Sequence, residues 1–323
     1  MRVIFEIPLL FLGRCLIPLL TRKAVIGLSR VAGSLTYKLS HKQRRVAEAN
    51  VEVAFGDTKS CDEKRDIIVK SFQSFALLLL DLFWFNAFTV RRLNRFARYD
   101  DSAKILLAPA PHILLTAHYG NWEIIGLNSG HVGRAMTSIA MPLKNSFIDR
   151  ELHRLRTKTG SAIAEREGGI TQIVRALRNG QNTTLLVDQN TIPEAGGVFV
   201  PFFGLPAPVT RAAGALWART KAEIVIAWCT PDENGVYTIY ARPLFPEGAP
   251  SLKSDQITAR SVQAIESIIR EHPEYWMWSY KRWRIWREAD DKSRFPFYAR
   301  PYERYARYYN RRFLHKQSST KDS

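Results

Sequence analysis

The stretch Ile113-Leu114-Leu115-Thr116-Ala117-His118-Tyr119-Gly120-Asn121-Trp122-Glu123 decides how this chain folds. Its first five residues are apolar or β-branched and predict a buried strand, the Gly-Asn pair predicts a turn, and Asn121 is a good N-cap for a helix that opens on Trp122. A strand that turns into a helix is the repeating unit of α/β proteins, whose ligands bind at the carboxyl ends of the strands. His118 therefore lies where an α/β active site is expected.

The same alternation continues along the central part of the chain. We expect strands near Ile113 to Ala117, Ala135 to Met141, Ser161 to Ala164, Thr183 to Asp188, Ile224 to Thr230 and Val236 to Ala241. Helices fit near Trp122 to Leu127, Ser146 to Lys158, Ile170 to Arg178, Thr210 to Thr220 and Asp255 to Glu271. The sequence thus predicts an α/β fold with a mixed, mostly parallel sheet flanked by helices.

The region before this sheet contains one clear helix signal and one stretch of membrane character. Ser60 followed by Glu63 is a capping box, which opens a helix toward Phe85 whose apolar end is typical of core. Val3 to Leu20 is apolar but barely long enough to cross a bilayer, and it contains two charges and two prolines. We expect a retained anchor lying in or dipping into the inner leaflet; a full span and a buried core helix are the alternatives.

These signals divide the chain into three parts. Residues 1–45 are expected to form a membrane-associating N-terminal segment, residues 46–316 a catalytic domain, and residues 317–323 a polar tail.

His118 and Glu123 are the candidate catalytic pair. A helix turns about 100° per residue, so five positions place two side chains roughly 140° apart on a helix, and only a turn at the strand end can fold Glu123 under the imidazole. An anionic Glu123 that accepts from one ring nitrogen leaves the other free to take a proton from a substrate hydroxyl. Alternatively, the histidine is hydrogen-bonded for packing and the glutamate is an unrelated surface residue.

Around this pair the chain resembles the late acyltransferases of lipid A biosynthesis, the lauroyl and myristoyl transferase family, over most of its length. The family's first motif, His-x-Gly-Asn-x-Glu, is matched by His118, Gly120, Asn121 and Glu123. Four further blocks follow in the family's order: Met141 to Gly160 with Arg156 before the glycine, Arg175 to Gly180 with Leu185 to Gln189, the apolar loop Gly197 to Ala207, and Pro273 to Trp278 with Arg282-Trp283.

This resemblance implies a glycerolipid acyltransferase-like fold and an enzyme on the cytoplasmic face of a bacterial inner membrane. It implies transfer of a fatty acyl chain from acyl carrier protein, or from acyl-CoA, to a hydroxyl of a lipid A precursor, with no metal and no cofactor. We assign Arg156 to the oxyanion or to a substrate phosphate, unless it pairs with an acid on a helix surface. Asp188 either binds the acceptor's sugar, holds Arg156 or is purely structural, and Asn121 completes the substrate-binding or oxyanion group.

Composition agrees with a membrane-surface enzyme. The net charge of +17 favours anionic partners, such as acidic phospholipid, a phosphorylated glycolipid or nucleic acid. Three scattered cysteines suit a reducing compartment and are expected to be ordinary buried thiols. No glycine-rich loop has the spacing of a nucleotide site, and no Gly-x-Ser-x-Gly elbow carries a covalent serine.

Two aromatic-rich regions have competing interpretations. Five apolar residues of the Gly197 to Ala207 loop line an acyl tunnel, face lipid or belong to the core: Phe199, Val200, Phe202, Phe203 and Leu205. The mixture of aromatic and basic residues from Tyr275 to Arg287 has the composition of an interfacial belt, and the same mixture stacks on nucleic-acid bases in other proteins.

Two alternatives to a lipid A acyltransferase remain open from the sequence. One is an acyltransferase on another glycolipid, of the phosphatidylinositol mannoside type, with acyl-CoA as donor. The other is a non-enzymatic basic protein that binds membrane or nucleic acid. For the enzyme we expect an anionic membrane surface and a glycolipid as partners, and no nucleic acid.

Overall fold

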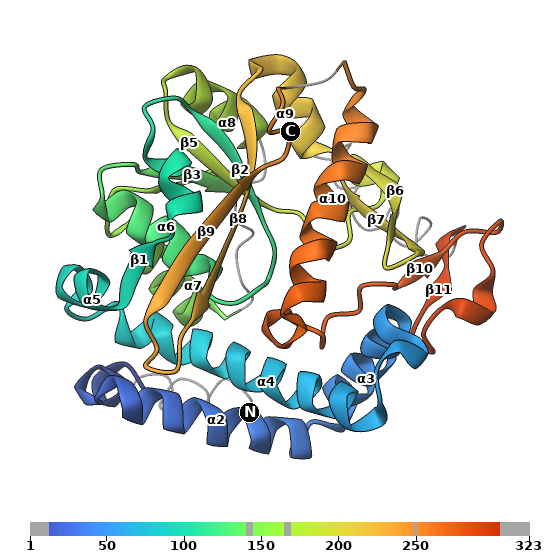
Figure 1. The fold of residues 1–323 in the computed structure, drawn as a ribbon, viewed down its shortest axis with the longest axis horizontal. Coiled ribbons are helices and arrows are strands. Elements are labelled where there is room, and N and C mark those ends of the chain that lie inside the picture. The colour runs from blue at the N-terminus through green and yellow to red at the C-terminus, as the bar shows by residue number, and fades with distance from the viewer. Residues whose placement is uncertain (1–12, 140–144, 165–168, 249–250, 304–323) are drawn as a thin grey trace, which may run out of the picture.

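A seven-stranded sheet forms the centre of the molecule in the computed structural model, which describes residues 13–139, 145–164, 169–248 and 251–303 (Figure 1). The strand order is β1-β9-β8-β2-β5-β3-β4. The strands are β1 (Ala97–Tyr99), β2 (His112–Thr116), β3 (Met136–Ile139), β4 (Ala162–Ala164), β5 (Asn182–Leu186), β8 (Glu223–Pro231) and β9 (Tyr237–Pro243). Five neighbouring strands from β8 to β4 are parallel and β9 runs antiparallel to β8, so the predicted mixed, mostly parallel sheet is confirmed.

Helices cover both faces of this sheet because its strands are apolar on both sides. Ile113 and Leu115 of β2 belong to one core cluster and Leu114 to the other, as the alternation of side chains along a strand requires. One face carries α6 (Trp122–His131) and α7 (Ser146–Thr157), and the other carries α8 (Gly169–Arg178), α9 (Ala212–Thr220) and α10 (Ser254–Glu271). The predicted strands and helices of this region are all present, with ends that shift by a few residues.

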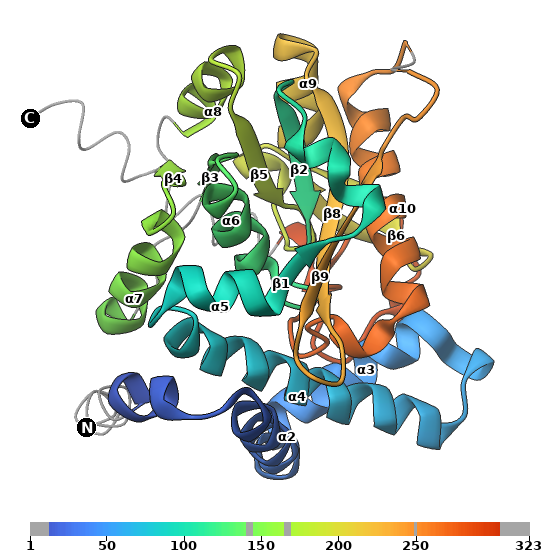
Figure 2. The same ribbon diagram turned by 60° about the vertical axis from the view of Figure 1, so that its left-hand side comes forward.

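A layer of long helices lies under the carboxyl ends of the parallel strands. Its members are α2 (Arg22–Leu39), α3 (His41–Phe55) and α4 (Cys61–Trp84), with the short α5 (Thr89–Phe96) at one side. In Figures 1 and 2, α4 lies between α2 and the sheet, and α2 forms the outer edge of the molecule. The predicted capping box of α4 is confirmed, because Ser60 accepts from the Glu63 N–H and Glu63 accepts from the Ser60 N–H.

By length and composition α4 is able to cross a membrane, but its packing is that of a core helix. Half of its most apolar stretch is buried inside the protein. Phe72 and Leu82 belong to the two core clusters and Leu78 is buried, as predicted for its apolar end, whereas Phe75 and Leu79 of the same end are exposed.

A buried ion pair joins α2 to α4. Arg22 donates to both carboxylate oxygens of Asp81, and Asp81 also accepts from the Tyr237 hydroxyl and from the Asn121 side chain. Burial on its own lowers the pKa of Arg22, but Asp81 and then Tyr237 outweigh it, and the pKa ends above its ordinary value. The carboxylate of Asp81 thus links α2 to Asn121, the N-cap residue of α6.

The apolar loop of the sequence is a hairpin of β6 (Gly197–Phe202) and β7 (Leu205–Thr210) packed into the core. Phe202 lies against Trp276 and Trp283, and Phe203 against Trp278. Val200 and Leu205 are also buried, and only Phe199 of the five is half-exposed. Core packing is therefore the correct interpretation of Val200, Phe202, Phe203 and Leu205.

The helix predicted to start at Thr210 begins at Ala212, because Thr210 is the last residue of β7.

The interfacial belt predicted from Tyr275 to Arg287 is wrong for its central residues. Trp276, Trp278 and Trp283 are at most 1% exposed, and Arg282 is fully buried. Indoles that fill a core cannot lie among lipid headgroups or stack on nucleic-acid bases.

The remaining short elements join these layers or close the chain. They are η1 (Ile17–Leu19), η2 (Gly56–Thr58), η3 (Asp101–Leu107), η4 (Pro193–Ala195), η5 (Pro273–Tyr275), η6 (Lys292–Arg294), β10 (Ile285–Trp286) and β11 (Arg300–Pro301). Cys15 and Cys61 are exposed, so the expectation of a buried thiol holds for Cys229 alone. Most of the predicted N-terminal anchor, the Met141 to Lys144 part of the second block and the polar tail lie outside the described residues.

Candidate active site

His118 and Asp188 meet because their strands are parallel neighbours in register. Thr116 of β2 pairs with Leu186 of β5, and these are the last residues of the two strands. His118 and Asp188 each follow two residues later. The Nδ1 atom of His118 lies 2.8 Å from Oδ1 of Asp188, and the His118 backbone N–H donates to Oδ2 at 2.9 Å. The imidazole is thus oriented by Asp188.

A buried indole completes the surroundings of this carboxylate. The Nε1–H of Trp276 donates to Oδ2 of Asp188 at 2.9 Å. Burial alone raises the pKa of Asp188, but the His118 ring, the indole and the His118 N–H outweigh it, and the pKa is lowered. An ionised carboxylate only accepts hydrogen bonds, so it fixes a ring hydrogen on Nδ1 of His118, and in the neutral imidazole Nε2 is then the acceptor.

The second ring nitrogen of His118, Nε2, lies beside Gln189. The side chain is 19% exposed, and Nε2 lies 3.2 Å from the side-chain nitrogen of Gln189. With Nε2 unprotonated, the Gln189 amide donates to it. A ligand that approaches Nε2 has to replace this contact.

The backbone of the turn after His118 is fixed on two sides. Gly120 has a φ of +56°, and a Cβ there would lie 1.9 Å from the Cys229 carbonyl oxygen, so only glycine fits. Its N–H donates to Tyr275, and the next N–H donates to that same Cys229 carbonyl. The Met277 N–H donates to the His118 carbonyl, so the closing signature of the sequence packs directly on the turn.

Asn121 holds the start of α6. Its side-chain oxygen accepts from the Ile124 N–H, as its predicted N-cap role requires, and its amide donates to Asp81. Both polar groups are used and the residue is 2% exposed. The structure thus gives Asn121 the role of N-cap of α6, and its assignment to substrate binding stays a prediction.

Glu123 pairs with Arg156 and not with His118. Its two oxygens accept from Nε and Nη2 of Arg156 at 2.8 and 2.6 Å, a bidentate contact, and one oxygen also accepts from the Trp122 indole at 2.9 Å. The Trp122 ring lies edge-on to the His118 ring, with centroids 4.8 Å apart. The expectation that Glu123 orients the imidazole is wrong, because Asp188 occupies Nδ1; a catalytic role for Glu123 stays a prediction.

Arg156 is held in place beside the site by this carboxylate. Burial on its own lowers the pKa of Arg156, but the bond and charge of Glu123 outweigh it, and the pKa is raised. Within the described part of the chain Nη1 has no hydrogen-bond partner, so this end of the guanidinium is available to a ligand. The prediction that Asp188 holds Arg156 is corrected: Glu123 does so.

A cavity extends from this group along α6. Trp122, Glu123 and Arg156 contribute to its lining. Gly126 also lines it and lies one turn further along the same face of α6, where a Cβ would meet only the Met136 sulfur at 3.9 Å. The apolar part of the lining consists of Leu127, Met136, Ile139 and Leu186. The polar group beside His118 therefore opens into apolar space between α6 and the sheet.

Sequence reasoning missed three contributors to the site: Trp276, Gln189 and Trp122. All three lie inside the blocks that carried the resemblance, but nothing in their spacing reveals that they contact His118 or Asp188. Among the described residues, no three His, Cys, Asp or Glu side chains are grouped as a metal site requires.

Comparison with known proteins gives one family over most of the chain. The profile described as "Bacterial lipid A biosynthesis acyltransferase" matches residues 5–285. The chain is 26% identical over 251 residues to Lipid A biosynthesis acyltransferase 2 of Shigella flexneri, covering 76% of this chain and 78% of that protein. It is 23% identical over 269 residues to Lipid A biosynthesis acyltransferase of Haemophilus influenzae, covering 81% and 83%.

Among solved structures, the 1-acyl-sn-glycerophosphate acyltransferase PlsC of Thermotoga maritima is similar at a TM-score of 0.34 and 12% identity. The match covers 78% of this chain and 98% of that one.

Proposed function

Because the chain belongs to the bacterial lipid A biosynthesis acyltransferase family, we propose that it transfers a fatty acyl chain from a thioester to a hydroxyl of a lipid A precursor. In this proposal His118 is the general base and Asp188 is the carboxylate that orients it. The observation that carries it is the short contact between Nδ1 of His118 and Asp188, which leaves Nε2 as the proton acceptor. The cavity begins at Trp122, whose ring contacts the His118 ring.

The reaction follows from that arrangement. Nε2 of His118 takes the proton of the acceptor hydroxyl as its oxygen attacks the thioester carbonyl carbon. The C–O bond forms, the C–S bond breaks, and the imidazolium returns the proton to the departing thiolate, so the products are an ester and a thiol. Asp188 stabilises the imidazolium in between, and a positioned base of this kind contributes roughly 10²- to 10⁴-fold to the rate.

The tetrahedral intermediate carries a negative oxygen that needs a donor. Arg156 supports this role, because Glu123 engages Nε and Nη2 and leaves Nη1 for a ligand. The same atom suits a phosphate of the glycolipid, and the two uses differ in their effect on kcat and KM.

The apolar cavity along α6 suits the acyl chain. It begins at Trp122, which contacts the His118 ring, and continues past Gly126 to apolar side chains. A chain lying there would place its thioester end beside Nε2. In this proposal the acyl chain lies between α6 and the sheet and not along the β6–β7 hairpin, because Phe202 and Phe203 of the hairpin belong to the core.

Acyl carrier protein is the donor we propose, and the cytoplasmic face of the bacterial inner membrane is the location. Acyl carrier proteins are acidic, so a chain with a net charge of +17 steers their docking. Nothing in the described residues favours the mannoside-type acceptor with acyl-CoA over this assignment.

One assay tests the proposal. Purified protein in detergent is given a tetra-acylated lipid A precursor and acyl carrier protein or CoA charged with chains of different length, and wild type is compared with His118→Ala. We expect transfer by the wild type and a loss of about 10²-fold or more in the variant. No transfer with any donor, or undiminished transfer by the variant, contradicts the proposal.

A further inference from the structure

The orientation of α2 about its own axis is fixed by its contacts with α4. Val25 and Ser29 are buried, and Gly33 approaches so closely that a Cβ there would lie 2.4 Å from the Cα of Gln73. The buried ion pair of Arg22 with Asp81 holds the beginning of the helix. Because these contacts occupy one side of α2, the opposite side is held outward.

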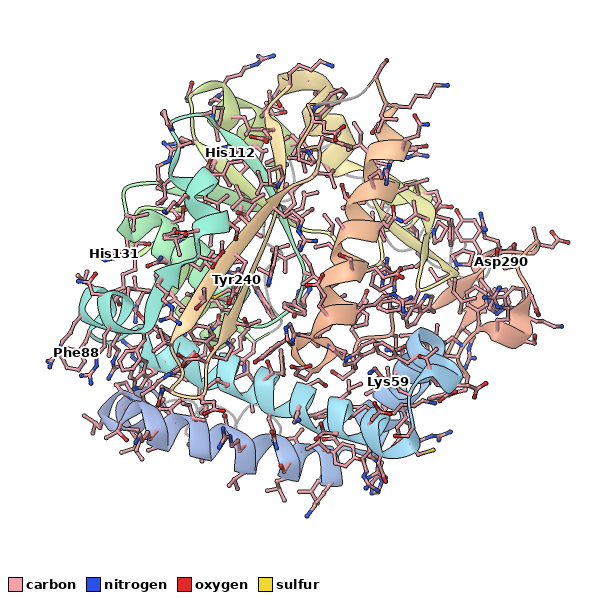
Figure 3. The ribbon with its side chains drawn as sticks, in the orientation of Figure 1. Lys59, Phe88, His112, His131, Tyr240 and Asp290 are labelled. Atoms are coloured by element: carbon pink, nitrogen blue, oxygen red, sulfur yellow. The ribbon has the colours of Figure 1, made fainter. Side chains whose placement is uncertain are left out.

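That outward side is apolar. Leu28, Val31, Leu35 and Leu39 follow one another at intervals of three and four residues, which places them on one helical stripe. They are 39%, 66%, 52% and 67% exposed. Figure 3 shows side chains projecting from the outer edge of α2, away from the rest of the molecule. We name these four residues the α2 stripe.

The charges beside the stripe are all of one sign. Lys23, Arg30 and Lys38 are exposed on α2, and the helix contains no acidic residue. A helix with an apolar stripe flanked by basic residues lies in the plane of an anionic membrane surface, where apolar burial and attraction to lipid headgroups act together. The same combination does not suit a second copy of this chain, because a net charge of +17 makes two copies repel one another.

We propose that the α2 stripe lies on an anionic phospholipid bilayer, with α2 parallel to the membrane plane. This inference rests on the proposed inner-membrane function and specifies which surface of the protein contacts the membrane. His112, the first residue of β2, lies at the end of the sheet away from α4 in Figure 3, so the strand ends that carry His118 point toward the helix layer. The active site then lies in the half of the molecule nearest the lipid.

The test compares wild type with the Val31→Asp/Leu35→Asp double variant of the full chain. Each is floated with vesicles of phosphatidylethanolamine and phosphatidylglycerol, and with vesicles in which phosphatidylcholine replaces the anionic lipid. Val132→Asp is the matched control, because Val132 is 43% exposed and follows α6. Thermal unfolding of all variants verifies that they are folded.

We expect the double variant to bind anionic vesicles at least about tenfold more weakly than wild type, and the control to bind normally. Wild type is expected to bind vesicles without anionic lipid more weakly. Equal flotation of wild type and the double variant overturns the proposal, as does equal binding to both kinds of vesicle. A change in oligomeric state without a change in flotation also overturns it, because a second copy is then the partner.

Activity in detergent separates this inference from the proposed function. The double variant leaves the His118 site untouched and is expected to retain transfer on precursor dispersed in detergent. His118→Ala is expected to lose transfer while it still floats with anionic vesicles.

Discussion

Replacing Asp188 by asparagine tests the central geometry of the site. The carboxylate accepts from three donors: Nδ1–H and the backbone N–H of His118, and the Trp276 indole. An asparagine has one side-chain oxygen. We expect it to take the Oδ2 position, because the His118 backbone N–H and the Trp276 indole both donate there. Its NH2 group then faces Nδ1 of His118.

A donor facing Nδ1 forces the imidazole into the other tautomer. Nε2 then carries the hydrogen and is unable to accept a proton from the acceptor hydroxyl. Since a positioned base contributes about 10²- to 10⁴-fold, we expect Asp188→Asn to lower kcat by at least about 10²-fold, with little change in KM. Raising the pH does not restore the rate, because the defect lies in the tautomer and not in the charge.

The assay combines kinetics with a direct reading of the ring. Steady-state transfer to the lipid A precursor gives kcat and KM, and nitrogen-15 NMR of the histidine side chain shows which ring nitrogen carries the hydrogen. Glu123→Gln is the matched control, since it makes the same chemical change at the other acidic candidate. We expect its His118 tautomer to remain that of the wild type.

Two outcomes would refute this reasoning. One is a wild-type kcat in Asp188→Asn. The other is a switch of the His118 tautomer in Glu123→Gln but not in Asp188→Asn, which would make Glu123 the orienting acid after all.

Three other changes have distinct expected results. Arg156→Lys loses the bidentate contact with Glu123 and one donor to the site, so we expect kcat to fall about 10- to 10³-fold if it serves the oxyanion, and KM to rise instead if it binds a phosphate. Gly126→Leu projects into the cavity, and a competition between acyl donors is expected to show a shift toward shorter chains, whereas Gly126→Ala is tolerated; an unchanged preference places the acyl chain elsewhere. Because the pKa of Asp188 is lowered in the folded protein, its contribution to the free energy of unfolding is present above the ordinary value of 3.8 and is lost as the pH falls through the lowered one. Lowering the pH below about 4 is therefore expected to decrease the free energy of unfolding of the wild type more than that of Asp188→Asn, as measured by urea denaturation. Parallel dependences of this free energy on pH in the two proteins would contradict the prediction.

The buried ion pair gives a fourth, structural prediction. Asp81→Ala leaves Arg22 buried without its partner, so we expect a loss of about 3–5 kcal/mol in the free energy of unfolding, measured by urea denaturation. Asp66→Ala on the exposed side of the same helix is the control, since its ion pair with Lys70 is solvent-exposed and contributes about 1 kcal/mol or less. Equal losses would show that the buried pair does not hold α2.

Local patterns were enough to predict the elements and several of their ends. The apolar run before His118 became β2, Asn121 caps α6, and Ser60 with Glu63 forms the predicted capping box. These features depend on neighbours a few residues apart, and such neighbours are visible in the chain itself. The same local view misassigned the region from Tyr275 to Arg287, because an aromatic and basic composition does not reveal which side is buried.

The order of the chain was enough to select the candidate residues of the site: a histidine after a buried strand, an aspartate after another, and an arginine near a glycine. Their partners were decided by the tertiary structure. His118 meets Asp188 because β5 lies beside β2 in parallel register, 70 residues away in sequence, while Glu123, only five residues away, is turned by the start of α6 toward Arg156. Proximity in sequence determines which side chains share a helix or strand. Which strands become neighbours depends on the packing of the whole core, and the strand order in turn determines which distant side chains touch.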